Sequence, residues 1–398
     1  MFARGRSTRG QMKSPSIAQR GEGGVRGGSG ELDPTAQGRP EAQRDAVKGP
    51  SAPGSLKGPQ QSQTTRTPTR YAQAMGEFDL IARYFTRPTK RALLGVGDDC
   101  ALLQPAEGMQ LAVSSDMLVE GRHFFADVDP HALGHKALAV NLSDLAACGA
   151  QPLAFTLALA LPRVDENWLA GFSRGLFALA DTHDCELVGG DTTQGPLTIC
   201  ITVFGEVPRG QALLRSGAQA GDDVYVSGTL GEARLALDAL RDHAPLPDEL
   251  LALARHRLEQ PTPRVALGLA LRGIATAAID VSDGLLGDLG HILKASRVGA
   301  CIDTSIAINL IATTAHIARA ERLFSYEKML DYVLAGGDDY ELAFTAPAAL
   351  RQAVQQAAQQ TNTVVTRIGQ IEAAPGLRLR NAQGQLLEKR YASFDHFL

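Results

Sequence analysis

The sequence predicts two domains, an N-terminal α+β domain with a mixed sheet and a C-terminal α/β domain, preceded by a disordered arm. The chain has 398 residues, 44% hydrophobic and 21% charged, which is enough for about two globular domains. Its composition changes sharply near residue 75. Beyond that point, segments with helical periodicity alternate with segments of strand periodicity, and Pro208-Arg209-Gly210 separates them into two units.

Residues 1–74 form the predicted arm. They contain 12 Gly and 7 Pro, and twelve Lys and Arg against five Asp and Glu. Their few large apolar residues follow no regular period, so the segment cannot bury enough surface to offset the entropy lost on ordering. A transit peptide and a basic nucleic-acid-binding arm are alternatives, but the segment shows neither an amphipathic helix nor interleaved aromatic residues. Met75 is an alternative start of translation.

The first domain should span residues 75–207. Apolar residues recur at helical intervals in three of its segments and form strand-like stretches in two others. Gly149 is a stop signal for the second helix. The predicted helices are 78–85, 133–148 and one from about 165, and the predicted strands are 111–116 and 197–204.

The second domain should span residues 208–398. The same patterns predict helices near 231–240 and 264–272 and from 284, with strands at 223–226, 277–279 and 332–334. Residues 303–330 give only weak signals. The segment Gly228-Thr229-Leu230-Gly231 resembles a phosphate loop that enters a helix, although a plain tight turn is the favoured interpretation.

Hydropathy and cysteine usage exclude several classes of protein. No apolar run approaches the ~18 residues of a membrane helix, so an integral membrane role is excluded. The cysteines are scattered, odd in number and without a C-x-x-C pair, which argues against a disulfide framework and a structural zinc site. This fits a reducing compartment, and we expect a cytoplasmic protein. The five cysteines are Cys100, Cys148, Cys185, Cys200 and Cys301.

Five apolar stretches run through small residues into aspartate. An aspartate at the end of a buried strand, beside glycines that let a ligand approach, can hold a hard cation. Each one alone could instead serve as a turn or helix cap. Asp144, one helical step from Asn141, adds a sixth candidate. The five stretches end at Asp99, Asp116, Asp191, Asp283 and Asp339.

The aspartates together point to Mg²⁺. Converging carboxylates repel one another unless cations neutralise them, and oxygen ligands without paired His or Cys favour magnesium over zinc or copper. Magnesium held in this way usually implies a phosphate ligand. The chain lacks G-x-x-x-x-G-K-[ST] and G-x-G-x-x-G, so a nucleotide would have to be held mainly through metals.

Ten motifs, in this order, resemble the thiamine-monophosphate kinase family over nearly all of residues 75–398. Within the wider superfamily of aminoimidazole ribonucleotide synthetase, hydrogenase-maturation and selenophosphate enzymes, the opening, the GRHF box and the ending point to the kinase. The motifs are GEFDLIARYF, GVGDDCALL, SSDMLVEGRHF, HKALAVNLSDLAACGAQP, LVGGDTT, GP with its following strand, RSGAQAGD, IDVSDGLLGDLGHI, LAGGDDYELAFT and FDHF.

The resemblance implies ATP-dependent phosphorylation of thiamine monophosphate to thiamine diphosphate. It implies a homodimer whose N-terminal domains pair, with ATP between the domains and several Mg²⁺ ions. The implied metal ligands are Asp99, Ser114, Ser115, Asp116, Asp144, Asp191, Asp280 and Asp283. The implied ATP-binding residues are Gly190, Asp191, Arg215 and Ser282, and the implied substrate residues are His123, Asp338 and Phe394.

Other interpretations of single residues remain open. His123 could be an ordinary surface histidine, and Phe394 could serve C-terminal packing. Lys136 is expected at a solvated helix position, without a role in the site. Asp338 stands where the family commonly has a glutamate and is one methylene shorter, while Ser115 replaces a frequent threonine.

The expected chemistry is direct in-line transfer without a phosphoenzyme. The acceptor is an ionised phosphate oxygen, so no general base is required and none is assigned. The nearest rival is another ATP-using enzyme of the same superfamily acting on a different substrate. A rival of another class is a catalytically silent nucleotide-sensing or nucleic-acid-binding protein that uses the arm, but the intact set of aspartates argues against it.

Overall fold

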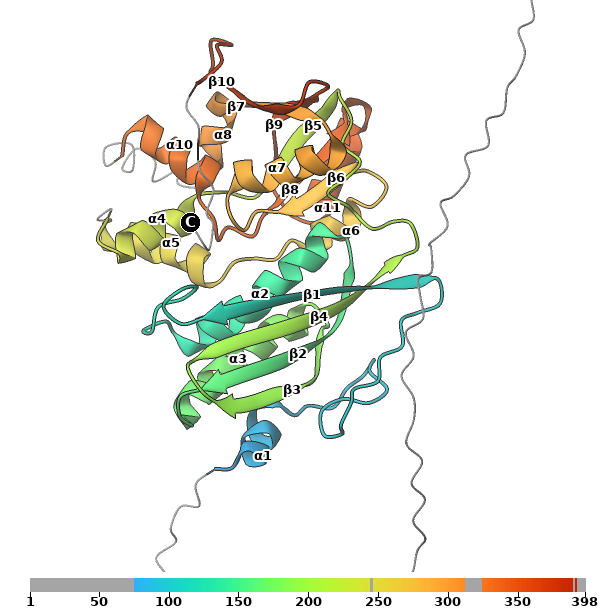
Figure 1. Ribbon diagram of the computed structural model, residues 1–398, viewed down its shortest axis with the longest axis vertical. Coiled ribbons are helices and arrows are strands. Elements are labelled where there is room, and N and C mark those ends of the chain that lie inside the picture. The colour runs from blue at the N-terminus through green and yellow to red at the C-terminus, as the bar shows by residue number, and fades with distance from the viewer. Residues whose placement is uncertain (1–74, 244–245, 312–323, 389–390, 392–398) are drawn as a thin grey trace, which may run out of the picture. The chain divides into compact units, whose positions relative to one another are not determined.

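The computed structural model describes residues 75–243, 246–311, 324–388 and 391, and it contains two sheets (Figure 1). The predicted arm, residues 1–74, and Phe394 lie outside the described residues. The strands of the first sheet are β1 (Met109–Val119), β2 (Gln151–Leu161), β3 (Glu186–Gln194) and β4 (Thr198–Pro208). Those of the second are β5 (Asp222–Ser227), β6 (Ala277–Asp280), β7 (Gly299–Asp303), β8 (Leu342–Pro347), β9 (Val365–Glu372) and β10 (Gly376–Arg380).

The helices begin close to residues that can cap them. Asp129 and Asp165, for example, each accept two backbone N–H groups at the start of a helix. The helices are α1 (Glu77–Leu80), which continues as the π-helix η1 (Ile81–Phe85), α2 (Pro130–Ala147), α3 (Glu166–Thr182), α4 (Glu232–Leu240), α5 (Asp248–Glu259), α6 (Val265–Ala270), α7 (Leu285–Ser296), α8 (Thr304–Ala307), α10 (Tyr326–Ala335) and α11 (Arg351–Gln360). Two short 3₁₀ helices are η2 (Ile308–Leu310) and η4 (Ala348–Leu350).

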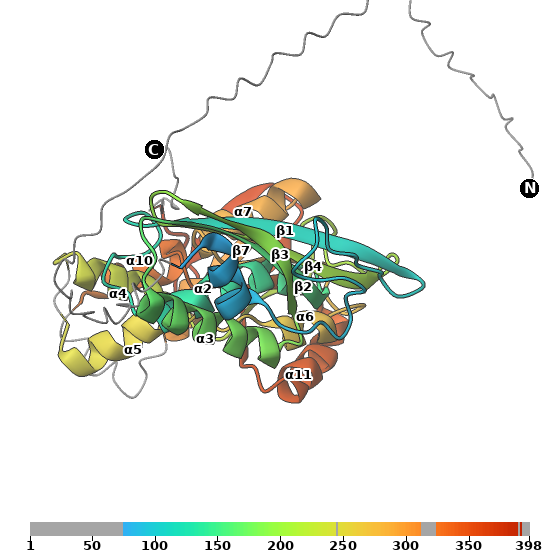
Figure 2. The same cartoon turned by 90° about the horizontal axis from the view of Figure 1, so that it is seen from below.

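The first sheet is mixed and has the strand order β1-β4-β2-β3. The β1–β4 and β4–β2 pairs are antiparallel, whereas β2 and β3 run parallel. Helices α2 and α3 lie on one side of it (Figures 1 and 2). Part of the other face is open, and Val113 and Met117 of β1 are each 55% exposed there.

The second sheet has the order β10-β7-β9-β5-β8-β6. Only β10 and β7 form a parallel pair, and the other neighbours are antiparallel. Helix α2 contacts strands of both sheets, β1 and β4 of the first and β6 and β8 of the second. All the described residues belong to one compact unit.

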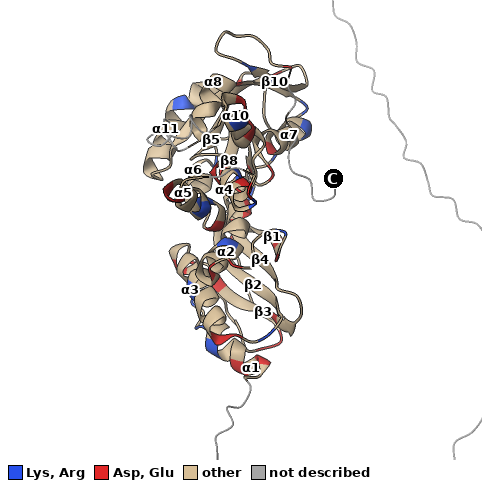
Figure 3. Cartoon of the chain, turned by 90° about the vertical axis from the view of Figure 1, so that its left-hand side faces the viewer, with Lys and Arg blue, Asp and Glu red and all other residues tan. Residues whose placement is uncertain are grey.

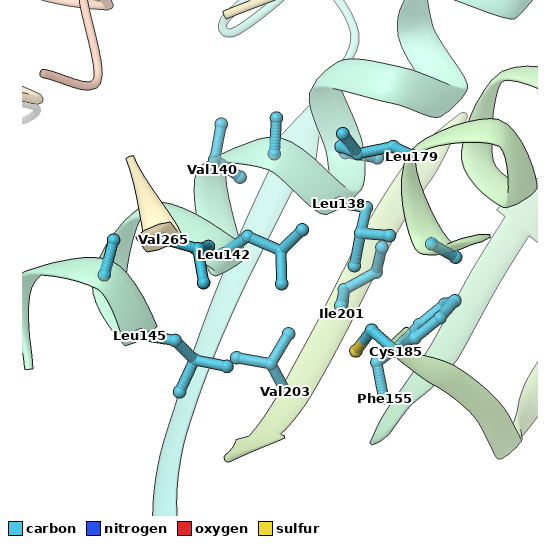
Figure 4. Packing of buried hydrophobic residues seen from close by; sticks show 14 of the residues in the cluster. Leu138, Val140, Leu142, Leu145, Phe155, Leu179, Cys185, Ile201, Val203 and Val265 are labelled. Atoms are coloured by element: carbon cyan, nitrogen blue, oxygen red, sulfur yellow. The ribbon is translucent and has the colours of Figure 1, made fainter. Parts of the chain in front are cut away.

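Helix α2 is therefore buried on two sides. Leu138, Leu142 and Leu145 pack toward Ile201 and Val203 of β4 (Figure 4). The same apolar cluster continues through α6 to β8 in the second sheet. One hydrophobic core thus connects the two sheets through α2.

The predicted fold class is confirmed, and one predicted element is wrong. Residues 332–334 were expected to form a strand but belong to α10, whose N-cap is Ser325. Tyr332, Val333 and Leu334 are all buried, and a short apolar run has the same pattern in a buried strand and a buried helix. None of the helices in the described part of the chain is long and apolar enough to span a membrane.

Two glycines allow α2 and α3 to approach closely. A Cβ added to Gly175 would lie 1.9 Å from the carbonyl oxygen of His131, and one added to Gly134 would lie 2.1 Å from that of Phe172. Backbone atoms cannot move aside as a flexible side chain can. The spacing of these helices thus depends on the absence of two methyl groups.

Replacing Gly175 by alanine should therefore destabilise the fold by about 1–3 kcal/mol, because the added methyl group overpacks the helix contact. Helix propensity alone predicts the opposite sign, a gain of up to about 1 kcal/mol. Gly290→Ala in α7 is the matched control, since nothing lies within 4 Å of its added Cβ. Urea titrations would measure both free energies of unfolding, and a Gly175→Ala protein as stable as the wild type would refute the close contact.

Candidate active site

One cavity gathers many of the residues that the sequence singles out. It has a volume of about 320 Å³, and residues of β1, α2, α4, β6 and the segment before β8 line it. Three arginines, Arg122, Arg234 and Arg241, share the lining, and acidic and basic residues occur together in this region in Figure 3. The predicted residues in this cavity are Asp116, His123, Asp144, Asp280, Ser282, Asp283 and Asp338.

Strand β1 presents alternate residues to helix α2. Ser114 Oγ donates a hydrogen bond of 2.5 Å to Asp144 Oδ2, and the backbone N–H of Asp116 donates to Asn141 Oδ1 at 3.1 Å. Asn141 Nδ2 in turn donates to the carbonyl of Ala137, one helical turn earlier. These contacts fix the position of the strand carboxylate relative to the helix carboxylate.

The carboxylates in this cavity disfavour one another's ionisation. Burial, together with the neighbouring Asp144, raises the pKa of Asp116 to about 7. Burial also raises the pKa of Asp144, although the Ser114 hydroxyl and the positive charge of Arg215 oppose the rise. The pKa of Asp280 is raised to about 7, first by burial and then by Asp144, although its Oδ2 accepts a 2.8 Å hydrogen bond from Ser143. A set of carboxylates with raised pKa values is suited to binding a cation that neutralises their charge.

Asp288 holds the loop between β6 and α7 through hydrogen bonds. The sequence motifs did not identify this residue as part of the site. Asp288 Oδ2 accepts the backbone N–H groups of Ser282, Asp283 and Gly284 at 3.0, 3.0 and 3.1 Å. Burial raises the pKa of Asp288 to about 6. Its carboxylate holds the loop that carries two of the predicted ligands. The only signal in the sequence was an aspartate in the first turn of a helix.

Lys136 does not point to solvent, contrary to the expectation from the sequence. Its side chain is 3% exposed, and its Nζ lies 3.0 Å from Asp338 Oδ1. The physical reason is the packing of α2 against other elements on two sides, which turns this position toward Asp338 rather than toward the outer surface. His123 also has a defined contact, because its Nδ1 accepts the N–H of Val119 at 3.0 Å. That bond requires the proton of a neutral imidazole to be on Nε2.

The remaining predicted residues lie elsewhere. Asp99, Gly190 and Asp191 line a second cavity of about 790 Å³, formed by β2, β3, α1 and the segment 96–101. The side chain of Ser115 points away from Asp116, since its Oγ lies 3.0 Å from Thr202 Oγ1 on the opposite face of the sheet. Arg215 lines neither cavity in the described residues, although its charge acts on Asp144.

The register shows how far apart the two sets lie. Asp116 is opposite Ile201 of β4, which is opposite Leu157 of β2, which is opposite Gly190 of β3. Three strand spacings of about 4.8 Å separate β1 from β3, roughly 14 Å. Asp191 follows Gly190 and therefore projects to the other face. The sheet itself thus divides the predicted ligands into two groups.

Of the five aspartates expected to end a strand, Asp283 follows β6, three residues after that strand ends at Asp280. Asp116 and Asp191 lie inside strands, and Asp99 lies in an irregular segment. Asp339 precedes β8, where both its carboxylate oxygens accept the N–H of Gly231, at 3.1 and 2.9 Å. Burial raises the pKa of Asp339 well above its usual value. The 228–231 loop therefore already holds a carboxylate of the chain, as expected for an anchored turn.

The donor set suits magnesium rather than a metal enclosed by protein. No three His, Cys, Asp or Glu side chains within the described ranges lie close enough together to enclose a metal ion. Mg²⁺ usually takes one or two carboxylates and completes its shell with water and phosphate oxygens. The neighbouring Asp116 and Asp144, with the Ser114 hydroxyl, are oxygen donors of this kind.

Comparison with known protein families identifies two domains in this chain. Residues 97–207 match the family described as AIR synthase related protein, N-terminal domain, and residues 219–381 match the corresponding C-terminal domain. The chain is 47% identical over 331 residues to the thiamine-monophosphate kinase of Salmonella typhimurium, covering 81% of this chain and 99% of the relative. The chain belongs to the thiamine-monophosphate kinase family, and the resemblance seen in its motifs is confirmed.

Two solved structures support this family membership. A crystal structure of thiamine-monophosphate kinase from Stenotrophomonas maltophilia is similar with a TM-score of 0.68 and 46% identity, covering 77% of this chain and 95% of that chain. A structure of AaThiL complexed with AMPPCP and TMP is similar with a TM-score of 0.63 and 29% identity, covering 74% of this chain and 89% of that chain.

The raised pKa values predict how stability depends on pH in protein freed of metal. An unfolded aspartate titrates near 3.8, whereas Asp116 and Asp280 retain their protons in the fold up to about pH 7. Their contribution to stability is complete below about pH 4 and is lost as the pH rises to about 7. The loss is at most about 1.4 kcal/mol per pH unit for each group.

Urea titrations in EDTA between about pH 5 and pH 8 would measure this effect. Asp116→Asn should become progressively more stable than the wild type as the pH rises, because the variant cannot ionise. A stability difference that does not change with pH would show that Asp116 titrates normally.

Proposed function

We propose that the chain catalyses ATP-dependent phosphorylation of thiamine monophosphate to thiamine diphosphate in the cytoplasm. The observation that carries the proposal is the cavity in which five aspartates and three arginines from both halves of the chain converge, in a member of this family. A relative bound to AMPPCP and TMP supports the pairing of a nucleotide with a phosphorylated acceptor. The opposite charges suit a reaction that brings two polyanions together.

We assign magnesium ligands to both faces of the first sheet. Bound Mg²⁺ would neutralise phosphate charge and hold the reacting groups in line. We assign the binding of ATP to four residues, Gly190, Asp191, Arg215 and Ser282. The inner ligands are Ser114, Asp116, Asp144, Asp280 and Asp283, and the outer ligands are Asp99, Ser115 and Asp191.

The chain itself supplies positioning and charge rather than acid–base chemistry. The attacking group is an ionised phosphate oxygen, so transfer is direct and needs no general base. Arg122, Arg234 and Arg241 can neutralise phosphate charge in the cavity. His123 and Asp338 are assigned to the acceptor, together with Phe394, which lies outside the described residues.

A small apolar pocket continues from the cavity and suits the ring of the acceptor. It shares His123 and Asp338 with the main cavity. Its apolar lining consists of Phe124, Phe125, Val128, Leu133, Leu237 and Leu258. An aromatic ring buried there would be held by its area, while its phosphate reaches the arginines.

We further propose that the chain forms a homodimer through the open face of the first sheet, within a domain of residues 75–207 followed by one of residues 208–398. Val113 and Met117 are large apolar side chains that are 55% exposed, on either side of Ser115 on that face. A second copy of the same face would cover them, as is usual for symmetric dimers.

Purified protein incubated with ATP, Mg²⁺ and thiamine monophosphate should form thiamine diphosphate and ADP in equal amounts, and no product would refute the proposed reaction. Asp116→Asn should reduce kcat by at least about 100-fold, because it removes a charge from the centre of the cavity. Asp165→Asn is the control, since asparagine also caps a helix and α3 begins outside the cavity.

The dimer proposal predicts that Val113→Glu combined with Met117→Glu yields a monomer, because charges would have to be buried against each other. Light scattering after gel filtration would measure the mass of wild type and variant. A wild-type protein that is monomeric at the concentrations of the assay would overturn this part of the proposal.

A further inference from the structure

We propose that Lys136 is a positioning residue for the acceptor, through its bond to Asp338. The inference rests on the proposed function, because it assigns Asp338 to the acceptor. It adds a residue on α2 whose side chain sets where the Asp338 carboxylate stands. Lys136 has no predicted contact with ATP or metal.

The burial of Lys136 shows that its bond is a fixed part of the site. Its side chain is 3% exposed, whereas that of Asp338 is 32% exposed. A buried ammonium is costly unless it is paired and hydrogen-bonded. Nζ donates to Asp338 Oδ1 at 3.0 Å and contacts the carbonyl oxygen of His123 at 3.5 Å. One ammonium group therefore contacts both described residues that we assign to the acceptor.

The backbone around Asp338 shows that the segment is held in a demanding conformation. Asp338 and Tyr340 have φ angles of +66° and +53°, which are uncommon for residues other than glycine. Such conformations are unfavourable and persist where the surroundings determine them. The Asp338 N–H donates to Ser282 O and the Tyr340 N–H to Val281 O, both at 2.8 Å. The segment is thereby tied to the loop that carries Asp283.

The two oxygens of Asp338 have different surroundings. Lys136 Nζ at 3.0 Å and the Tyr340 hydroxyl at 3.4 Å both donate to Oδ1. Among the described residues, none donates a hydrogen bond to Oδ2, and Asp338 lines both the main cavity and the small apolar pocket. Lys136 thus holds one oxygen so that the other is presented where the two cavities meet.

The position of Lys136 on α2 connects the acceptor to the carboxylates. Asp144 lies eight residues further along the same helix, about 12 Å at 1.5 Å per residue. A rigid helix therefore sets the separation between the group that orients the acceptor and one of the proposed metal ligands. Phosphoryl transfer depends on such alignment, because positioning supplies much of the rate enhancement.

The test compares Lys136→Met with the wild type by calorimetric binding of thiamine monophosphate, without ATP or Mg²⁺, and by steady-state kinetics. We expect Kd and KM for thiamine monophosphate to rise at least about tenfold, with KM for ATP unchanged. Lys136→Arg should recover part of the loss because it restores the charge. Lys294→Met, an exposed lysine on α7, is the matched control and should bind as the wild type does.

A double-mutant cycle with Asp338→Asn separates positioning from general structure. In the Asp338→Asn background, Lys136→Met should have little further effect on Kd, because its partner is already altered. Folded Lys136→Met protein with wild-type Kd, or an equal loss in both backgrounds, would overturn the inference while leaving the kinase proposal intact. If Lys136→Met does not fold, Lys136→Gln supplies the same comparison. A wild-type protein that does not phosphorylate thiamine monophosphate would instead overturn the proposed function.

Discussion

The burial of α2 on two sides is the constraint on which the site depends. Polar side chains on the buried faces of such a helix are shielded from bulk water and are stabilised by partners on neighbouring elements. Every such contact then ties the helix to a different part of the chain. Lys136 bonds to Asp338, and Asn141 bonds to the backbone of Asp116. Ser143 bonds to Asp280, and Asp144 bonds to Ser114. The arrangement of the cavity follows from the position of one helix.

The same burial makes the site costly to the fold. The pKa values of Asp116, Asp144 and Asp280 are raised, which means that ionising them in the folded chain opposes folding. The fully buried Leu138 and Leu142 lie on the same helix and supply apolar burial that opposes this cost. If the proposed cations bind these carboxylates, they would offset this cost, and folding would be coupled to cation binding.

The sequence was a good guide to the groups that carry charge and a poorer one to their surroundings. Its motifs located seven residues that the structure places in one cavity. Periodicity could not reveal that α2 is buried on both sides, so Lys136 was expected in solvent. The error at 332–334 has a similar cause, since a buried run has no polar face. The placement of Ser115, in contrast, could have been predicted from the sequence. Side chains alternate between the two faces of a strand, and Ser115 lies between Ser114 and Asp116.

That alternation bears on how the two groups of ligands could act together. Asp116 and Asp191 lie on opposite faces of the sheet, on strands roughly 14 Å apart at about 4.8 Å per strand. An aspartate side chain reaches only a few ångströms, and a magnesium ion binds oxygen at about 2.1 Å, so one chain cannot bring both carboxylates to one ion. If both groups serve a single nucleotide, they would have to hold different magnesium ions. The exposed Val113 and Met117, on either side of Ser115, lie on the same face as Asp191, so the proposed dimer contact would lie on the face of the outer group of ligands.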